Sequence, residues 1–294
     1  MKRRFVGQVV KGVGGVYTVS DGESTIKCYP RGKLRRQGEI YIGDMVEVEC
    51  DKEGIIESVK PRKSCLVRPY VANIDAVIIV IAPVPKPDFT LVDKLLIGSL
   101  EQGIEAFIVI NKCELNGAKE LEEYVRNDYR DQAEIFATSV DENIGIQNLC
   151  KRIGSMFVCM AGQSGVGKSS ILNALLGEDK CAIGDISVKS ARGRHTTRHV
   201  EIFRSAYGGQ IADTCGFSML EMPVIDPAVL REYYPDFEQF AENCKYRDCR
   251  HDCEEDCGVR SAASEGKLSG GRYERYLKLY KDAVKRWNNR YGNR

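Results

Sequence analysis

Short apolar runs alternate with charged and glycine-rich segments along the chain, and the character of these runs changes twice. Between residues 5 and 68, apolar and polar positions alternate in bursts of four to seven residues. These bursts predict five short strands, at residues 7–10, 16–19, 24–29, 45–49 and 54–60. Five strands of this length and spacing are typical of a small β-barrel of the OB type.

From residue 73 to residue 216, strand-like apolar runs alternate with amphipathic stretches of helical period. The strands are expected at residues 76–82, 106–110, 134–138, 156–161, 200–203 and 210–212. The helices are expected at residues 90–102, 118–128, 146–153 and 168–176. Asp88 is placed to cap the first helix and Gly103 to end it. This alternation predicts an α/β domain whose mainly parallel sheet is covered by helices.

Past Pro223 the sequence turns helical and rich in cysteine, and it ends in a basic helical stretch at residues 271–289. These changes divide the chain into three expected domains, at residues 1–68, 69–222 and 223–294. A length of 294 residues suggests two or three domains, because domains usually hold about 100 to 200 residues.

One loop of the middle domain has the pattern G-x-x-x-x-G-K-[ST], between an expected strand and an expected helix. Its residues are Gly162, Gln163, Ser164, Gly165, Val166, Gly167, Lys168, Ser169 and Ser170. Glycines in such a phosphate loop let successive backbone amides point at the β-phosphate of a nucleotide. Lys168 is expected to supply a point charge to the phosphates, and the Ser169 hydroxyl to coordinate magnesium.

A second segment is typical of recognition of the guanine base. Asn111, Lys112, Cys113 and Glu114 end the strand at 106–110, as the Asn-Lys-x-Asp segment does in GTP-binding proteins. An amide can pair with the base edge, and a carboxylate accepts hydrogen bonds from guanine groups that adenine lacks. Glu114 stands where aspartate is usual. One strand later, Ser139 and Val140 lie where a turn supports the base through a backbone amide.

The order of these parts is permuted. A phosphate loop normally opens its domain, whereas here 161 residues precede it, including the base-recognition segment. After the loop comes a polar stretch at residues 192–198, which is expected to be the first switch, with Thr197, or else Thr196, on magnesium.

The segment Asp213-Thr214-Cys215-Gly216 fits D-x-x-G and follows the strand at 210–212. In this pattern the carboxylate, here Asp213, holds magnesium through water, and the glycine amide, here Gly216, senses the γ-phosphate. The next residue carries a catalytic glutamine in Ras-type proteins, but here it is Phe217, which cannot orient water. His195 in the first switch is therefore the candidate that orients the attacking water.

A cysteine cluster near the C-terminus predicts a metal site. Cys244, Cys249, Cys253 and Cys257 fall within 14 residues, and His251 lies among them. Thiolates with an imidazole suit tetrahedral zinc, and four protein ligands leave no position for water, so the zinc is expected to be structural. From the spacing alone, either His251 or Cys253 can complete a set of four.

These residues, in this order, resemble the circularly permuted GTPases of bacteria that depend on the small ribosomal subunit. The likeness covers almost the whole chain and is close at residues 162–170 and 192–197. It implies an OB-type barrel, a permuted P-loop GTPase domain and a C-terminal zinc domain. It also implies GTP hydrolysis stimulated by the small subunit, a part in late subunit maturation, and Cys244, Cys249, His251 and Cys257 as the zinc ligands.

The distribution of charge favours an RNA partner. Residues 1–64 carry 13 Lys and Arg against 9 Asp and Glu, and residues 260–294 carry 10 against 3. Basic ends suit a polyanion such as ribosomal RNA, and the basic loop at 31–36 is a candidate contact; ordinary solvated charge is the alternative. The chain shows no apolar run of about 20 residues and no signal-peptide core, so a cytosolic protein is expected. The protein is also expected to act as a monomer.

The basic tail at 271–289 admits two interpretations. Its cationic and aromatic side chains offer phosphate contacts and stacking faces for RNA, or the helix packs on its own domain. These side chains are Arg272, Tyr273, Arg275, Tyr276, Lys278, Lys281, Lys285, Arg286 and Trp287. Two rival functions also stay open: an ATP-using P-loop enzyme, and an RNA-binding module whose nucleotide site does not hydrolyse.

Overall fold

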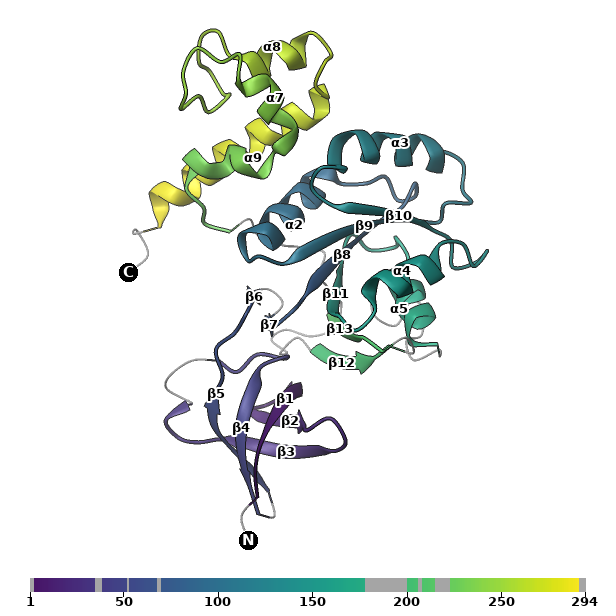
Figure 1. Cartoon of the computed structure of the whole chain (residues 1–294), viewed down its shortest axis with the longest axis vertical. Helices are drawn as coiled ribbons and strands as arrows, with labels where there is room; N and C mark the ends of the chain where they lie inside the picture. Colours follow the sequence, from purple (N-terminus) through teal and green to yellow (C-terminus); the bar gives the residue numbers. More distant parts are fainter. Residues whose placement is uncertain are drawn as a thin grey trace.

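The elements of the chain gather in three parts that follow one another along its longest axis (Figure 1). The computed structural model describes residues 3–34, 39–51, 53–67, 70–177, 200–205, 208–214 and 223–290. A β-barrel lies at the lower end in Figure 1, a helix-covered sheet in the middle, and a helical part at the upper end.

The barrel consists of five strands: β1 (Arg3–Val13), β2 (Val16–Ser20), β3 (Thr25–Pro30), β4 (Met45–Cys50) and β5 (Gly54–Val59). Their order is β1-β2-β3-β5-β4, and pairing of β1 with β4 closes the barrel. The five expected strands are therefore confirmed. β1 is much longer than expected because it pairs with both β2 and β4, and a register shift between Val9 and Lys11 bends it.

The middle sheet contains β8 (Ala76–Ile81), β9 (Glu105–Asn111), β10 (Glu134–Thr138), β11 (Phe157–Ala161), β12 (Val200–Arg204) and β13 (Gln210–Thr214). Its order is β10-β9-β8-β11-β13-β12, parallel except that β12 runs antiparallel to β13. β12 also pairs with β1, so that one eleven-stranded sheet runs from the middle part into the barrel. The sequence pattern predicted the two sets of strands but not this continuity.

Helices cover both faces of the middle sheet, because its central strands are apolar on both sides. Val77 and Ile79 of β8 face the cluster that includes α2 (Phe89–Glu101) and α3 (Ala118–Tyr129). Ile78 and Val80 face the cluster that includes α4 (Ile146–Ile153) and α5 (Lys168–Leu176). Asp88 caps α2 as expected, accepting from the backbone amides of Thr90 and Leu91.

The junction between barrel and sheet is tightly packed. Asp44 is fully buried and accepts two hydrogen bonds from Arg62, of 2.7 and 2.8 Å. Gly43 has φ +89°, and a Cβ there would lie 2.2 Å from the Ala72 carbonyl oxygen. A short hairpin of β6 (Cys65–Val67) and β7 (Tyr70–Ala72), which the sequence pattern did not predict, forms the connection.

The C-terminal part is helical: η1 (Pro227–Tyr233), η2 (Pro235–Phe237), α7 (Glu238–Ala241), α8 (Gly258–Ser264) and α9 (Gly270–Asn289). Tyr234, Phe237 and Tyr276 form an aromatic cluster at its centre, with ring centroids 5.0 and 5.1 Å apart. Among the described residues, no helix combines the length and the apolar character needed to cross a membrane.

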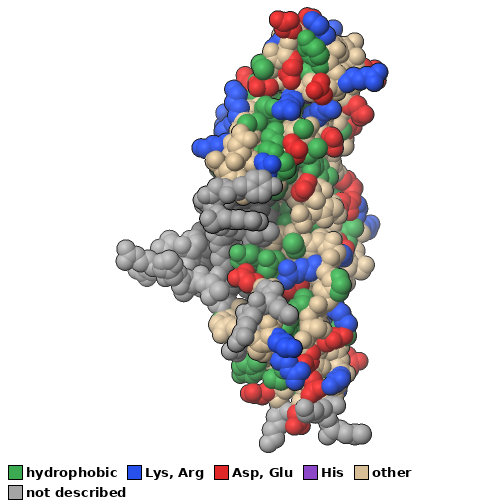
Figure 2. All heavy atoms as spheres, turned by 90° about the vertical axis from the view of Figure 1, so that its left-hand side faces the viewer, with side chains coloured by type: hydrophobic (Ala, Val, Ile, Leu, Met, Phe, Trp, Pro, Cys, Tyr) green, Lys and Arg blue, Asp and Glu red, His purple; other side chains and the backbone are tan. Residues whose placement is uncertain are grey.

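Basic and acidic side chains are interspersed on the face of the molecule shown in Figure 2. On the barrel, Arg4 pairs with Glu49 at 2.7 Å, and Lys60 pairs with Glu47. Arg31, from the basic loop predicted at 31–36, pairs with Glu57; Arg35 and Arg36 lie outside the described residues. Local pairing therefore neutralises part of the basic excess counted in the sequence.

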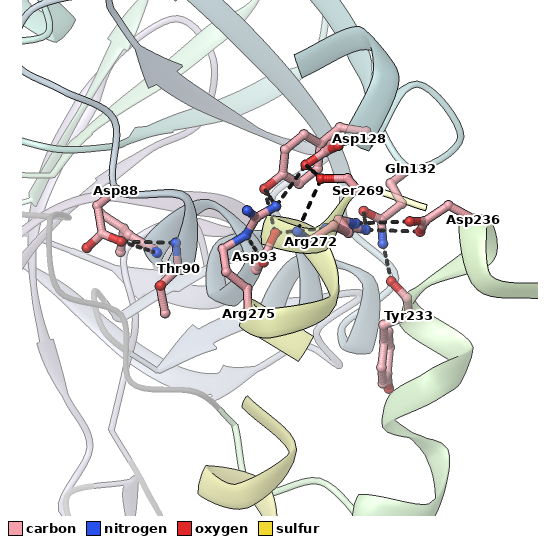
Figure 3. A network of polar contacts seen from close by, with 12 residues as sticks. Asp88, Thr90, Asp93, Asp128, Gln132, Tyr233, Asp236, Ser269, Arg272 and Arg275 are labelled. Atoms are coloured by element: carbon pink, nitrogen blue, oxygen red, sulfur yellow. Dashed lines mark hydrogen bonds and ion pairs between the residues drawn. The ribbon is translucent and has the colours of Figure 1, made fainter. Parts of the chain in front are cut away.

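The basic tail is not free, which corrects one of the two interpretations above. Arg272 is 1% exposed, Tyr276 is fully buried, and Arg275 is largely buried in a polar network beneath α9 (Figure 3). These side chains bind α2, α3 and the C-terminal core, so they are not available to phosphate groups. Lys278, Lys281 and Lys285 lie on the outward side of the same helix and are exposed.

Candidate nucleotide and metal sites

The phosphate loop connects β11 to α5, as its pattern predicts. Gly162, Gly165 and Gly167 have positive φ angles of 133°, 83° and 93°. A Cβ on Gly162 would lie 2.2 Å from the Val80 carbonyl oxygen, and a Cβ on Gly167 would lie 2.2 Å from Asn111 Nδ2. Only glycine satisfies both the backbone angle and the close approach at these two positions.

The first turn of α5 presents groups that suit a polyphosphate. The helix begins at Lys168, and its cap residue Gly167 provides no side-chain hydrogen bond, so backbone amides at this end can bind an anion. Lys168 Nζ donates to the carbonyl oxygens of Gly162, at 2.7 Å, and of Gln163. Burial lowers the pKa of this ammonium group to about 8. Ser169 and Ser170 are half-buried in the same turn.

The base-recognition segment lies against the phosphate loop, although 50 residues separate them in the chain. Asn111 ends β9, and its Nδ2 atom donates to the carbonyl oxygen of Val166 at 3.0 Å. Thr138 Oγ1 donates to Asn111 Oδ1 at 3.2 Å. Lys112 Nζ donates to the carbonyl oxygen of Gly165 at 2.8 Å. Because parallel strands end at one edge of a sheet, the loops after β9 and β11 meet whatever their order in the chain.

The same segment contains a buried carboxylate oxygen that has no partner among the described residues. Glu114 Oε2 is buried and forms no hydrogen bond with any residue that the structure describes. The next loop is ordered by its own contacts: the Ser139 amide donates to Ile144, and the Ser139 hydroxyl accepts from the Glu142 amide at 3.1 Å. Buried acceptors are normally satisfied, so Glu114 Oε2 marks a position where a donor is expected.

Asp213 lies at the same edge of the sheet. It is on β13, which pairs in parallel with β11 through Cys159 and Ala212. The carboxyl end of β13 therefore points to the phosphate loop, as the D-x-x-G pattern predicts. His195, Thr197, Gly216 and Phe217 lie outside the described residues.

One contact of the phosphate loop was not predicted. Gln163 Oε1 accepts from the Asp88 amide at 2.8 Å, and Gln163 Nε2 donates to the Lys86 carbonyl oxygen at 3.3 Å. This side chain holds the segment that leads into α2. No sequence signal indicates the contact, because it joins residues more than 70 positions apart.

The predicted metal cluster is assembled in the C-terminal part. One ligand atom each from Cys244, Cys249, His251 and Cys257 lies within 4.8 Å of all the others. Cys253 is exposed and is not in this group, so the structure selects His251 over Cys253. His251 has φ +58°, and its carbonyl oxygen accepts from the Tyr273 hydroxyl at 2.8 Å. Tertiary contacts thus fix the backbone that directs the imidazole towards the thiols.

The surroundings of the cluster suit a cation. Burial raises the pKa of the Cys249 thiol to about 12 and lowers the pKa of His251, so burial alone disfavours charge on both groups, and a bound cation would offset this cost for the thiol. The amide of Gly258 lies 3.3 Å from Cys244 Sγ, and that of Arg260 lies 3.4 Å from Cys257 Sγ. Amides that donate to sulfur stabilise thiolates, and a bound metal ion deprotonates coordinating thiols. The Cys3His set therefore fits a metal ion.

The fold and the loops at its edge define a class: P-loop GTPases in which the phosphate loop follows the base-recognition segment. Comparison with family models agrees. A model described as RsgA GTPase matches residues 59–223, and a model described as RsgA N-terminal domain matches residues 6–56.

Relatives match over nearly their whole length. A small ribosomal subunit biogenesis GTPase RsgA from Ruminiclostridium cellulolyticum is 39% identical over 285 residues, covering 94% of this chain and 93% of the relative. Another, from Caldanaerobacter subterraneus subsp. tengcongensis, is 38% identical over 296 residues and covers 99% of both. The chain belongs to the RsgA family of small ribosomal subunit biogenesis GTPases.

Solved structures show the same architecture. The crystal structure of YjeQ from Thermotoga maritima matches with a TM-score of 0.78 at 34% identity, covering 96% of this chain and 99% of that one. YloQ, described as a circularly permuted GTPase, matches with a TM-score of 0.74 at 27% identity, covering 97% and 96%. The resemblance stated from the sequence is thus confirmed.

Proposed function

We propose that the small ribosomal subunit stimulates GTP hydrolysis by this protein late in subunit maturation, and that hydrolysis times the protein's release. The contact of Asn111 with the phosphate loop carries the proposal. With Asn111 Nδ2 3.0 Å from the Val166 carbonyl oxygen, the base-recognition and phosphate-binding segments are in direct contact. A single guanine nucleotide can therefore contact both segments.

We assign the phosphates to the backbone amides of residues 162–170 and to Lys168. The magnesium ion would be held by Ser169 and Thr197, with Asp213 acting through water. The Gly216 amide would contact the γ-phosphate. Support for these roles comes from the positions of Lys168 and Ser169 in the first turn of α5 and of Asp213 on β13, at the same edge of the sheet.

We assign the base to Asn111, Glu114 and the loop after β10. Glu114 Oε2, which has no hydrogen-bond partner among the described residues, suits the ring N–H and exocyclic amine of guanine. Because the Ser139 amide is already bonded to Ile144, the supporting backbone donor is assigned to Val140. Lys112, in the base-recognition segment, stabilises the phosphate loop through its hydrogen bond to the Gly165 carbonyl oxygen.

Glu114→Ala should lower the preference for guanine over adenine nucleotides by about 100-fold or more. A hydrogen bond to a charged group contributes about 1.5–3 kcal/mol, so two such bonds contribute about 3 kcal/mol or more. Competition of GTP and ATP against a fluorescent guanine nucleotide measures this preference. The matched control is Glu142→Ala, which removes an exposed carboxylate from the neighbouring loop. An unchanged preference in Glu114→Ala would remove Glu114 from base recognition.

Phosphate release with and without purified small subunits tests the function itself. Turnover by the protein alone should be slow, since Phe217 occupies the glutamine position, and subunits should raise it. We assign the orientation of the attacking water to His195, so His195→Ala should lower stimulated turnover by about 10²–10⁴-fold with nucleotide affinity nearly intact. A wild-type rate that subunits do not change would refute the proposal.

We propose zinc as the metal of the Cys3His cluster. In a tetrahedral zinc site the bonds are about 2.3 Å to sulfur and about 2.05 Å to nitrogen, so a ligand sulfur and a ligand nitrogen would lie about 3.6 Å from each other. His251 Nδ1 lies 3.6 Å from Cys244 Sγ and 3.5 Å from Cys257 Sγ. Four protein ligands complete the coordination, so the role is structural.

We further propose that the barrel and the C-terminal part contact ribosomal RNA in the cytoplasm, with the protein acting as a monomer. On α9 the outward lysines Lys278, Lys281 and Lys285 are the candidates for phosphate contact. We also propose the domain limits 1–68, 69–222 and 223–294. Because one sheet continues from the middle part into the barrel, these two parts are joined by strand pairing and not only by a linker.

A further inference from the structure

Helix α2 contacts the phosphate loop at one end and the C-terminal part along its side. We propose that α2 is a rigid connection between the phosphate loop and the C-terminal part, which holds the Cys3His cluster. Through α2, nucleotide binding at the loop is coupled to the position of the C-terminal part. This inference rests on the proposed function, because it takes the loop around Gln163 to bind the nucleotide.

At the first end, the phosphate loop holds the entry to α2. Gln163 bonds both the Asp88 amide and the Lys86 carbonyl oxygen, at 2.8 and 3.3 Å. The Asp88 carboxylate in turn caps the helix, accepting from the amides of Thr90 and Leu91 at 3.0 and 3.1 Å. A displacement of the loop at Gln163 is therefore passed to the first turn of the helix.

Along its side, α2 is tied to α9 by buried charges (Figure 3). Asp93 is 1% exposed, and its two oxygens accept from Arg272 Nη1 and Arg275 Nε, each at 2.8 Å. The Tyr129 hydroxyl on α3 donates to the same carboxylate at 2.7 Å. Separating α9 from α2 would leave buried charges without partners, so the two helices are expected to move together.

Further bonds extend this attachment. Arg275 Nη2 contacts Asp128 Oδ2 on α3 at 3.0 Å, and Arg272 Nε contacts Asp236 Oδ2 at 3.2 Å. Gln132, after α3, bonds both Arg272 and the Tyr233 carbonyl oxygen. The C-terminal part is thereby fixed at several points on the α2 and α3 side of the sheet.

The two ends of the connection are close. Asp88 and Asp93 are five residues apart, which corresponds to about 7.5 Å along a helix axis. Within this span the chain is helical and capped, with no glycine or proline to act as a hinge. A nucleotide that shifts the loop therefore shifts the α9 attachment, and by reciprocity a partner bound to the C-terminal part alters nucleotide affinity.

Hydrogen exchange on the full-length, metal-loaded protein tests the coupling. Exchange of α9 amides at 270–280 is compared between the nucleotide-free, GDP-bound and non-hydrolysable GTP-analogue states. We expect wild-type rates to differ between two of these states by about fivefold or more, within the usual range of allosteric coupling. Equal rates in all states, with nucleotide binding shown directly by titration, would overturn the inference. Failure to bind nucleotide would instead refute the proposed function.

Two variants locate the route. Arg275→Met removes one of the two charges that α9 contributes to Asp93 and should reduce the difference at 270–280 while metal content and nucleotide binding persist. Lys278→Met, an exposed substitution one turn along the same helix, should retain it. A difference that is as large in Arg275→Met as in the wild type, or is lost in Lys278→Met, would also overturn the inference. Because the wild-type comparison needs no variant, an Arg275→Met protein that fails to fold leaves the test intact.

Discussion

Lys168→Met should lower the rate of GTP hydrolysis by about 10²–10³-fold, the usual effect of removing one group that stabilises transition-state charge. Lys168 opens α5, and its ammonium group lies across the phosphate loop, 2.7 Å from the Gly162 carbonyl oxygen. Methionine keeps most of the apolar stem and removes only the charge, so the fold should persist. Single-turnover phosphate release with saturating GTP measures the chemical step.

The matched control is Lys119→Met, which removes an exposed lysine from α3. Its rate should equal that of the wild type. If Lys168→Met binds GTP and hydrolyses it at the wild-type rate, the assignment of Lys168 to the transferred phosphate is wrong.

The burial of Lys168 adds a pH dependence to the same prediction. Burial lowers its pKa from 10.5 to about 8, so above that pH a growing share of the nucleotide-free protein carries a neutral amine. Phosphate oxygens favour the charged amine and raise its pKa on binding, so affinity should fall as pH rises from 8 towards 10.5. Titration with a fluorescent guanine nucleotide measures this fall, which Lys168→Met should reduce.

Loss of the metal should unfold the C-terminal part and leave the sheet folded. Apparent binding free energies of structural zinc are about 10–16 kcal/mol, as large as the stability of a whole domain. The cluster lies among the buried residues of this part, where Cys249, Cys257, Phe237 and Tyr276 belong to one apolar core. Chelation, or Cys257→Ser, should therefore raise hydrogen exchange at 223–290 while β8 and β9 stay protected.

Cys253→Ser is the matched control, because Cys253 lies between the ligands in sequence but is exposed. Metal analysis should give one zinc ion per chain in the wild type and in Cys253→Ser, and none in Cys257→Ser. Loss of zinc from Cys253→Ser would show that the ligand set is wrong. A folded C-terminal part without metal would show that the site is not structural.

The permuted order of motifs shows how much the sequence predicts about the nucleotide site. The phosphate loop, the Asn111 segment and Asp213 each lie at the carboxyl end of an apolar strand, and every such strand was predicted from its pattern. In a parallel sheet these strand ends share one edge, so convergence follows from the pattern even when the order is changed. The same reasoning could not predict the hydrogen bonds of Gln163 to residues 86–88, because they depend on which loops become neighbours in the fold.

In the C-terminal part, by contrast, the sequence left the choice of functional residues open. The sequence contains five candidate metal ligands, and spacing did not decide between His251 and Cys253. The structure decided it by giving His251 a left-handed backbone held by Tyr273, and by leaving Cys253 exposed. Similarly, the sequence of α9 allowed either RNA contacts or packing on its own domain for Arg272 and Arg275, and in the structure both side chains bind Asp93.

The sequence by itself determined the features that are local in the chain: the strands and helices, the glycine positions of the phosphate loop, and the set of cysteines. Hydrophobic period and backbone preference act over a few residues, so they can be read without the fold. Only the tertiary structure decided the β1–β12 pairing, the partners of Arg272 and Arg275, and the ligand choice at His251. These depend on contacts between residues far apart in the chain, which exist only once the helices and sheets have packed.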